Sequence, residues 1–309
     1  MRIVAAALLA LLFAASHTVA APISFRDLLA RPRAKPTEIV HYAPGAHQFA
    51  ELWLPKGHGP FQTVVLIHGG CWLAELPGTE LMAYMAADLQ ANGYAVWSID
   101  YARIGEPGGG YPGTYQDTGR AIDKLRSIAA AKGLDLKHLV VIGHSAGGHL
   151  ALWAAARPKV AKESPIGSVD PLSIAGVVSL AGIGDLKAYR SDGPTACGGP
   201  DTIDAIAGAS RGGDPYKDTS PAALVPLGVP QAIISGALDP IVPPKFGWDY
   251  AMAAAGAGDH VRQLTIEDAG HFELIDPTSA AWAKVKLEID IATGRVPAPK
   301  LPEPIHPKN

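Results

Sequence analysis

The stretch Val140–Trp153, VVIGHSAGGHLALW, places a serine between glycines at the point where two kinds of sequence meet. Before the serine, Val140 to Ile142 are β-branched and apolar, which is typical of a buried strand. After it, a run rich in Ala and Leu favours a helix. A glycine-flanked serine between a strand and a helix predicts a sharp turn that exposes the hydroxyl of Ser145 at the end of the strand.

Outward from this stretch, short apolar runs alternate with segments of helical periodicity. The runs are rich in Val and Ile and apolar on both faces, as parallel strands covered by helices are; they comprise residues 63–69, 94–100, 138–145, 175–182 and 230–237. Apolar stripes at helical spacing occur at Leu81, Met85 and Leu89, at Ile122, Leu125 and Ile128, and at Trp282, Val285 and Ile289. We expect Asp276 and Pro277 to be the N-cap and first residue of the last helix.

This alternation predicts an α/β fold, a doubly wound and mostly parallel sheet with helices on both faces. Residues 50–55 and 261–267 would add strands at its edges. The length of the chain suits a single domain over residues 21–294. Within it, residues from about 184 to 229 are rich in Gly, Pro, Asp and Ser, and predict a small insertion with one short helix near Ile203–Ile206.

Both ends of the chain fall outside this domain. Residues 1–20 combine a basic start, an apolar run and small residues at the end, the layout of a cleavable secretory signal peptide. We therefore expect export to the periplasm or the exterior. Residues 295–309 contain five prolines and predict an extended or disordered tail.

Charge and composition exclude several classes of partner. With 26 basic and 29 acidic residues and no long run of either sign, the chain is not expected to bind nucleic acid or an anionic membrane surface. No later stretch approaches the ~20 apolar residues of a membrane span, so no integral membrane segment is expected after signal cleavage. The motifs imply no cofactor and no metal, and the oligomeric state stays open.

The chain contains two cysteines, Cys71 and Cys197. They are too few for a disulfide-built scaffold or a cysteine zinc site. An oxidising compartment would permit one bridge between them without requiring it.

A serine nucleophile needs a base to take its proton. Of the 11 histidines, His271 follows the last predicted strand and precedes the last helix, in a loop that should return to the strand ends. His144 lies inside the serine turn and His149 one helical turn further on, so we interpret both as packing or surface residues. His271 is therefore the candidate base.

The base in turn needs an acid that orients it. Asp239 ends the segment QAIISGALD, after the strand that follows the insertion, and begins a Pro-rich turn. Asp259, Asp268 and Asp276 are alternatives, although loops or helix caps explain them adequately. The order serine, aspartate, histidine along the chain accompanies this kind of serine turn.

A third motif, HGGCW at residues 68–72, follows another predicted strand. Small residues there can aim backbone N–H groups at a developing oxyanion, together with the N–H of Ala146.

The combination of HGGCW, GxSxG and the downstream Asp and His resembles the α/β-hydrolase superfamily. HGGCW and the segment 98–117, with Asp-Tyr at a strand end before a Gly/Pro loop, resemble its esterase and arylformamidase branch, which includes bacterial feruloyl-esterase-like enzymes. The resemblance covers about residues 51–291. Many relatives carry glycine or an aromatic residue where this chain has Cys71, and the thiol would narrow the pocket. The resemblance implies the following roles: Ser145 as nucleophile, His271 as base, Asp239 as acid, and Gly70, Cys71 and Ala146 as oxyanion-hole donors.

These observations predict an exported serine esterase whose partner is a small-molecule ester with a short or aryl-bearing acyl group. Trp72, Tyr111 and the Gly/Pro loop are expected to rim an apolar pocket of modest size. Two alternatives stay open: hydrolysis of an aryl formamide or peptide bond by the same triad, and a binding module that keeps the fold without the chemistry.

Overall fold

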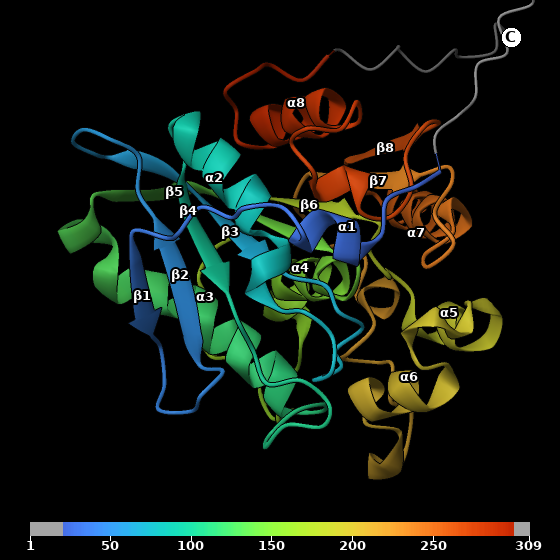
Figure 1. Ribbon diagram of the computed structural model, residues 1–309. Coiled ribbons are helices and arrows are strands. Elements are labelled where there is room, and N and C mark those ends of the chain that lie inside the picture. The colour runs from blue at the N-terminus through green and yellow to red at the C-terminus, as the bar shows by residue number, and fades with distance from the viewer. Residues whose placement is uncertain (1–20, 300–309) are drawn as a thin grey trace, which may run out of the picture.

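A sheet of strand order β1-β2-β4-β3-β5-β6-β7-β8 runs through the computed structural model, which describes residues 21–299 (Figure 1). Both pairings that involve β2 are antiparallel and all others are parallel. The expected α/β class with a mostly parallel sheet is therefore confirmed. The strands are β1 Glu38–His41, β2 Phe49–Trp53, β3 Phe61–Ile67, β4 Ala95–Ile99, β5 Leu134–His144, β6 Gly176–Leu180, β7 Gln231–Gly236 and β8 Val261–Ile266.

Helices cover both faces of the sheet, with α2 and α8 on one side and α3 and α4 on the other (Figure 1). The central strands β4, β6 and β7 are buried along their whole length, which is why they are apolar on both faces. The helices are α1 Phe25–Leu29, α2 Ala83–Ala91, α3 Gly113–Lys132, α4 Ala146–Ala156, α5 Leu186–Asp192, α6 Pro200–Ala207, α7 Pro244–Gly256 and α8 Trp282–Ala292.

Three sequence predictions about the elements need correction. Residues 50–55 were expected at an edge of the sheet, but β2 lies between β4 and β1. Strand β1 was not expected, because its four residues are mostly exposed and show no apolar alternation. Helix α8 begins at Trp282 and not at Pro277. Asp276 is engaged elsewhere, since its carboxylate accepts hydrogen bonds from Thr278 and from the guanidinium of Arg31.

The segment between β6 and β7 contains two helices, α5 and α6, where one had been expected. Asp185 is the N-cap of α5, and its carboxylate accepts the N–H groups of Lys187 and Ala188. The segment is anchored on α4, because His149 Nε2 donates to the carbonyl of Thr219 at 2.9 Å. This contact makes His149 a buried packing residue.

The expected signal peptide lies outside the described residues, as do residues 300–309 of the expected tail. Within residues 21–299, no helix has both the length and the apolar character needed to cross a bilayer.

The buried His149 predicts acid sensitivity of the fold. Burial lowers its pKa to about 4 from an ordinary 6.5, so the native state stays neutral at pH values where the unfolded chain takes up a proton. The free energy of unfolding should therefore fall by up to ~3 kcal/mol from this residue as pH drops from 6.5 to 4. His149→Gln cannot be protonated, and urea denaturation at a series of pH values should show a shallower acid slope. His138→Gln, at an exposed position, is the matched control; an unchanged slope in His149→Gln contradicts the prediction.

Candidate active site

Ser145 stands between the end of β5 and the start of α4, with φ 57° and ψ −122°. This left-handed region is unfavourable for a residue with a side chain and costs on the order of 1–3 kcal/mol. The flanking glycines permit the turn. A Cβ on Gly143 would lie 1.9 Å from the carbonyl oxygen of Gly147, and one on Gly147 would lie 2.1 Å from that of Ile67. The strand and the helix therefore meet at a distance that only glycine allows.

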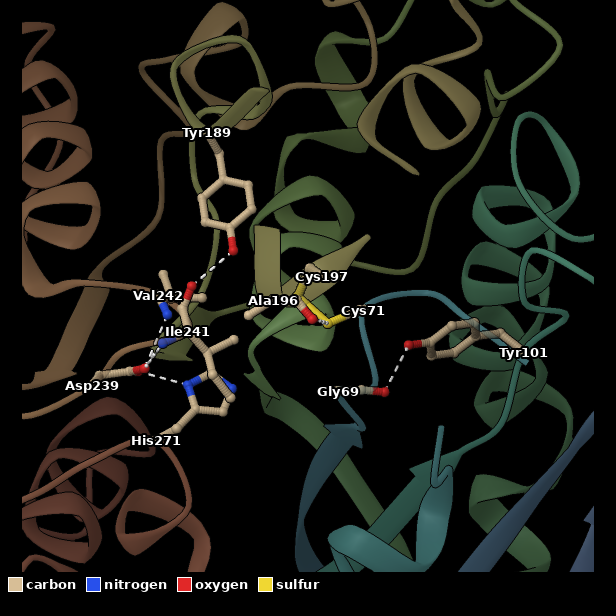
Figure 2. The surroundings of a disulfide bond; sticks show 10 residues. All are labelled: Gly69, Cys71, Tyr101, Tyr189, Ala196, Cys197, Asp239, Ile241, Val242 and His271. Atoms are coloured by element: carbon tan, nitrogen blue, oxygen red, sulfur yellow. Dashed lines mark hydrogen bonds and ion pairs between the residues drawn. A yellow bond between two sulfur atoms is a disulfide. The ribbon is translucent and has the colours of Figure 1, made fainter. Parts of the chain in front are cut away.

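His271 and Asp239 lie together in the loops that follow β8 and β7. The Nδ1 atom of His271 is 2.6 Å from Oδ2 of Asp239, and both side chains are almost fully buried (Figure 2). The other carboxylate oxygen of Asp239 accepts the backbone N–H groups of Ile241 and Val242 at 2.8 and 2.9 Å. Because a carboxylate only accepts, Nδ1 carries the proton and Nε2 of a neutral His271 is left as an acceptor.

Two of the other candidate acids are engaged elsewhere, and the third is exposed. The carboxylate of Asp259 accepts hydrogen bonds from the N–H groups of Leu227 and Gly228. Asp276 binds Arg31 and Thr278, as described above, and Asp268 is exposed. The structure thus pairs His271 with Asp239.

His144 also contacts this pair, a relation that the sequence did not indicate. It is buried within the serine turn, and its Nε2 atom donates to the carbonyl oxygen of His271 at 2.9 Å. The two imidazole rings lie 4.5 Å apart between centroids. Burial, reinforced by the nearby His271, holds the pKa of His144 well below its usual value, so His144 is neutral. Its hydrogen bond ties the serine turn to the backbone of His271.

The HGGCW loop, residues 68–72, follows β3 and passes directly beside Ser145. A Cβ placed on Gly69 would lie 3.0 Å from Cβ of Ser145. Three consecutive residues have positive φ: Gly70 at 98°, Cys71 at 51° and Trp72 at 58°. Within residues 21–299, the N–H groups of Gly70 and Cys71 donate to no protein acceptor. The N–H of Ala146, the first residue of α4, likewise has no intrahelical partner.

A buried polar cluster holds the first residue of the HGGCW loop. His68 Nε2 is 3.0 Å from Oδ1 of Asp100, and the ring of Tyr101 stacks on His68 at 4.3 Å. The hydroxyl of Tyr101 donates to the carbonyl of His68 at 2.9 Å. Burial alone would raise the pKa of Asp100, but the hydrogen bond from His68 and the other favourable contacts outweigh it and lower the pKa. Asp100 and Tyr101, which follow β4, thus anchor the loop. In the sequence this pair was part of the resemblance to the esterase branch and did not indicate an anchoring role.

The two expected pocket residues are placed differently from the prediction. Trp72 is fully buried, and its ring meets that of His149 edge-on at 5.3 Å. A fully buried ring does not rim a pocket open to solvent, so this expectation needs correction. Tyr111 is half-buried, stacks under the guanidinium of Arg211 at 4.2 Å, and lines a cavity of about 540 Å³ that also includes Lys159. Arg211 belongs to the predicted insertion of residues 184–229, and the residues that line this cavity do not include Ser145, Asp239 or His271.

Cys71 and Cys197 form a disulfide with their Cα atoms 5.0 Å apart (Figure 2). The sequence had left this bridge open. It joins the HGGCW loop to the turn Thr195–Cys197 between α5 and α6. Among the described residues, no three or more His, Cys, Asp or Glu side chains are grouped so as to hold a metal ion.

The sheet order, the strained serine turn and the His-Asp pair beyond the last two strands define the α/β-hydrolase class of fold. The chain belongs to the BD-FAE family, esterase-like α/β hydrolases, whose family model matches residues 51–250. Esterase LipC of Mycobacterium tuberculosis is 27% identical over 260 residues, which cover 79% of this chain. The match spans 63% of LipC, less than two thirds of that relative.

Solved structures show the same fold at low sequence identity. Inhibited esterase B from Lactobacillus rhamnosis superposes with a TM-score of 0.73 and 19% identity, covering 87% of this chain and 91% of esterase B. Butyrate-bound Est2 from Thermogutta terrifontis gives a TM-score of 0.67 and 21% identity, covering 85% of this chain and 96% of that one.

The serine turn predicts that Gly147→Ala is severely destabilising. The new methyl group would overlap the carbonyl oxygen of Ile67, and α4 can relieve the clash only by moving off β3. We expect a loss of about 3 kcal/mol in the free energy of unfolding, as for other severe core overpacking. Gly256→Ala at the end of α7 is the control, because its Cβ would meet nothing within 4 Å. Equal stability of the two variants in urea denaturation would refute this account of the turn.

Proposed function

We propose that the protein is an exported serine hydrolase that cleaves carboxylic esters of short or aryl-bearing acyl groups through an acyl-enzyme. The observation that carries this proposal is the meeting of three elements at one edge of the sheet. These are the strained turn of Ser145, the His271–Asp239 pair and the HGGCW loop with its free N–H groups. The turn is joined to His271 by the hydrogen bond from His144, and the loop approaches Ser145 at Gly69. Membership of a family of esterase-like hydrolases and the likeness to LipC support ester hydrolysis.

In the proposed acylation step, the hydroxyl oxygen of Ser145 attacks the ester carbonyl carbon while Nε2 of His271 takes its proton. The imidazolium that forms is stabilised by Asp239, whose own orientation is fixed by two backbone N–H groups. The carbonyl oxygen becomes an oxyanion that accepts N–H groups of the HGGCW loop and of Ala146. When the tetrahedral intermediate collapses, the C–O bond to the leaving group breaks and His271 returns the proton to the departing alkoxide.

Deacylation repeats these roles with water. His271 removes a proton from water as the water oxygen attacks the acyl carbon, and the second tetrahedral intermediate uses the same N–H donors. Collapse breaks the bond to Ser145, and His271 protonates the serine oxygen. The products are the free acid and the resting enzyme, so the proton balance closes without any group other than those named.

Two features support a small acyl group. The helices of the insertion are short, with 7 residues in α5 and 8 in α6, which do not amount to the long apolar helices of an interfacial lipase lid. The butyrate-bound structure of Est2 shows that this fold can hold a four-carbon acid. Export is supported by the layout of residues 1–20 and by the disulfide, because such bonds persist in oxidising compartments.

Ser145→Ala tests the proposed nucleophile. Removing the hydroxyl prevents the covalent intermediate, so kcat for p-nitrophenyl acetate should fall by about 10⁴-fold or more with unchanged circular dichroism. Labelling by a fluorophosphonate probe should be lost at the same time. Ser127→Ala, at an exposed position on α3, is the control that should keep both properties. Full activity of Ser145→Ala would exclude the proposed mechanism, and a wild type that neither reacts with the probe nor hydrolyses esters would favour a binding module.

Acyl-chain length tests the proposed substrate class. Each methylene that a pocket cannot hold costs ~1–3 kcal/mol of discrimination, so kcat/KM should be high for p-nitrophenyl acetate and butyrate and low for palmitate. The measurement is a series of p-nitrophenyl esters under one set of conditions, with an aryl formamide such as N-formyl-kynurenine beside them. Preference for long chains contradicts the prediction, and a far higher kcat/KM for the formamide would select arylformamidase activity instead.

A further inference from the structure

Cys71 occupies an unusual place in the HGGCW loop, because no backbone hydrogen bond holds it. Within residues 21–299, neither its N–H nor its carbonyl oxygen pairs with another backbone group. Its φ of 51° lies in the left-handed region, which a residue with a Cβ adopts only when its surroundings impose it. Something other than hydrogen bonding must therefore hold this residue.

The rest of the loop is held from both sides. On the β3 side, His68 is fixed by Asp100 and Tyr101, as described above. On the other side, the carbonyl of Trp72 accepts the N–H of Ile104 at 2.7 Å, and the carbonyl of Gly70 accepts the N–H of Leu73 at 2.8 Å. Among residues 70–72, Cys71 is thus the one whose N–H and carbonyl oxygen both lack a backbone hydrogen bond.

The disulfide supplies the missing tie. Cys197 is almost fully buried in the turn Thr195–Cys197, and both sulfur atoms lie beside the HGGCW loop (Figure 2). That turn is itself well anchored, because α6 directly after it buries Ile203 and Ile206 in the core. A Cβ on Gly198 would lie 3.6 Å from the side chain of Leu73, so the turn also packs against the end of the loop.

We propose that Cys197 is a positioning residue for the oxyanion hole. Through the disulfide it holds Cys71 in the left-handed conformation, and this conformation keeps the N–H of Cys71 turned toward the oxyanion and not toward a protein acceptor. The inference rests on the proposed function, since it concerns how efficiently the same site stabilises its transition state. It also makes full activity depend on oxidation of the two thiols.

A purely structural bridge is the competing explanation. The disulfide closes a sequence separation of 126 residues, and cross-links over long loops stabilise a fold by restricting the unfolded chain. Such a bridge would change the melting temperature and leave the turnover of each folded molecule unaltered. A positioning role instead predicts that kcat of each folded molecule changes when the bridge is removed.

The test is Cys197→Ser, which breaks the bridge and leaves every residue of the HGGCW loop unchanged. The enzymes are assayed with p-nitrophenyl butyrate well below the melting temperature, and kcat is divided by the concentration of active sites titrated with a fluorophosphonate. We expect kcat per site to fall about 10-fold or more, within the 10²–10³-fold limit for loss of one oxyanion donor, with little change in KM. Ala196→Ser, in the same turn and exposed, keeps the bridge and should keep the wild-type kcat.

A pair of double variants tests the conformational part of the proposal. Glycine adopts positive φ without penalty, whereas alanine does not. In the Cys197→Ser background, Cys71→Gly should therefore give a higher kcat per site than Cys71→Ala. Equal values for the two would show that the left-handed conformation is not what the bridge maintains.

Three other outcomes overturn the inference. Mass mapping of the wild type without reductant could find both thiols free. An unchanged kcat per site with a lowered melting temperature would assign the bridge to stability alone, and a raised KM with unchanged kcat would assign it to substrate binding. A wild type without esterase activity overturns the proposed function and this inference together, whereas an active wild type with an equally active Cys197→Ser variant overturns the inference alone.

Discussion

The close approach of α4 to the end of β3 is the constraint on which the rest of the site depends. Gly147 lies so near the carbonyl oxygens of Ile67 and His68 that a methyl group would be 2.1 and 2.4 Å from them. This approach brings the first turn of α4 against the strand that leads into the HGGCW loop. As a result, Ser145 and the N–H groups of the loop share one small region, and the free N–H at the helix start points into it.

The remaining parts of the site follow from the parallel sheet. The carboxyl ends of parallel strands meet at one edge, so the loops after β3, β5, β7 and β8 all emerge there. These loops carry His68, Ser145, Asp239 and His271, which lie far apart in the sequence. The strands are buried and rigid, and the irregular backbone that chemistry requires is confined to their ends.

Polar groups buried around the site hold its geometry through hydrogen bonds between segments. His144 supports the backbone of His271, His149 connects α4 to the insertion, and Asp100 holds His68, the first residue of the HGGCW loop. The insertion contributes the disulfide as a further tie. Each contact links segments that lie far apart in the sequence around the left-handed residues of the site.

Local features of the sequence were sufficient to predict most of the sheet. Strands buried on both faces are mostly apolar, so five central strands could be identified within a few residues. The exposed strand β1 lacks this signal and was missed. The serine turn could also be identified, because its requirement for glycine is set by the adjoining strand and helix.

The tertiary structure decided which segments distant in the sequence contact one another. Four aspartates could have oriented a histidine, and only the packing of the loops after β7 and β8 places Asp239 at 2.6 Å from His271. The pairing of Cys71 with Cys197 spans 126 residues, and the burial of Trp72 depends on where α4 carries His149. A sequence records which side chains a strand or turn requires locally. Which loops meet depends on how the whole sheet packs, and no local pattern encodes that.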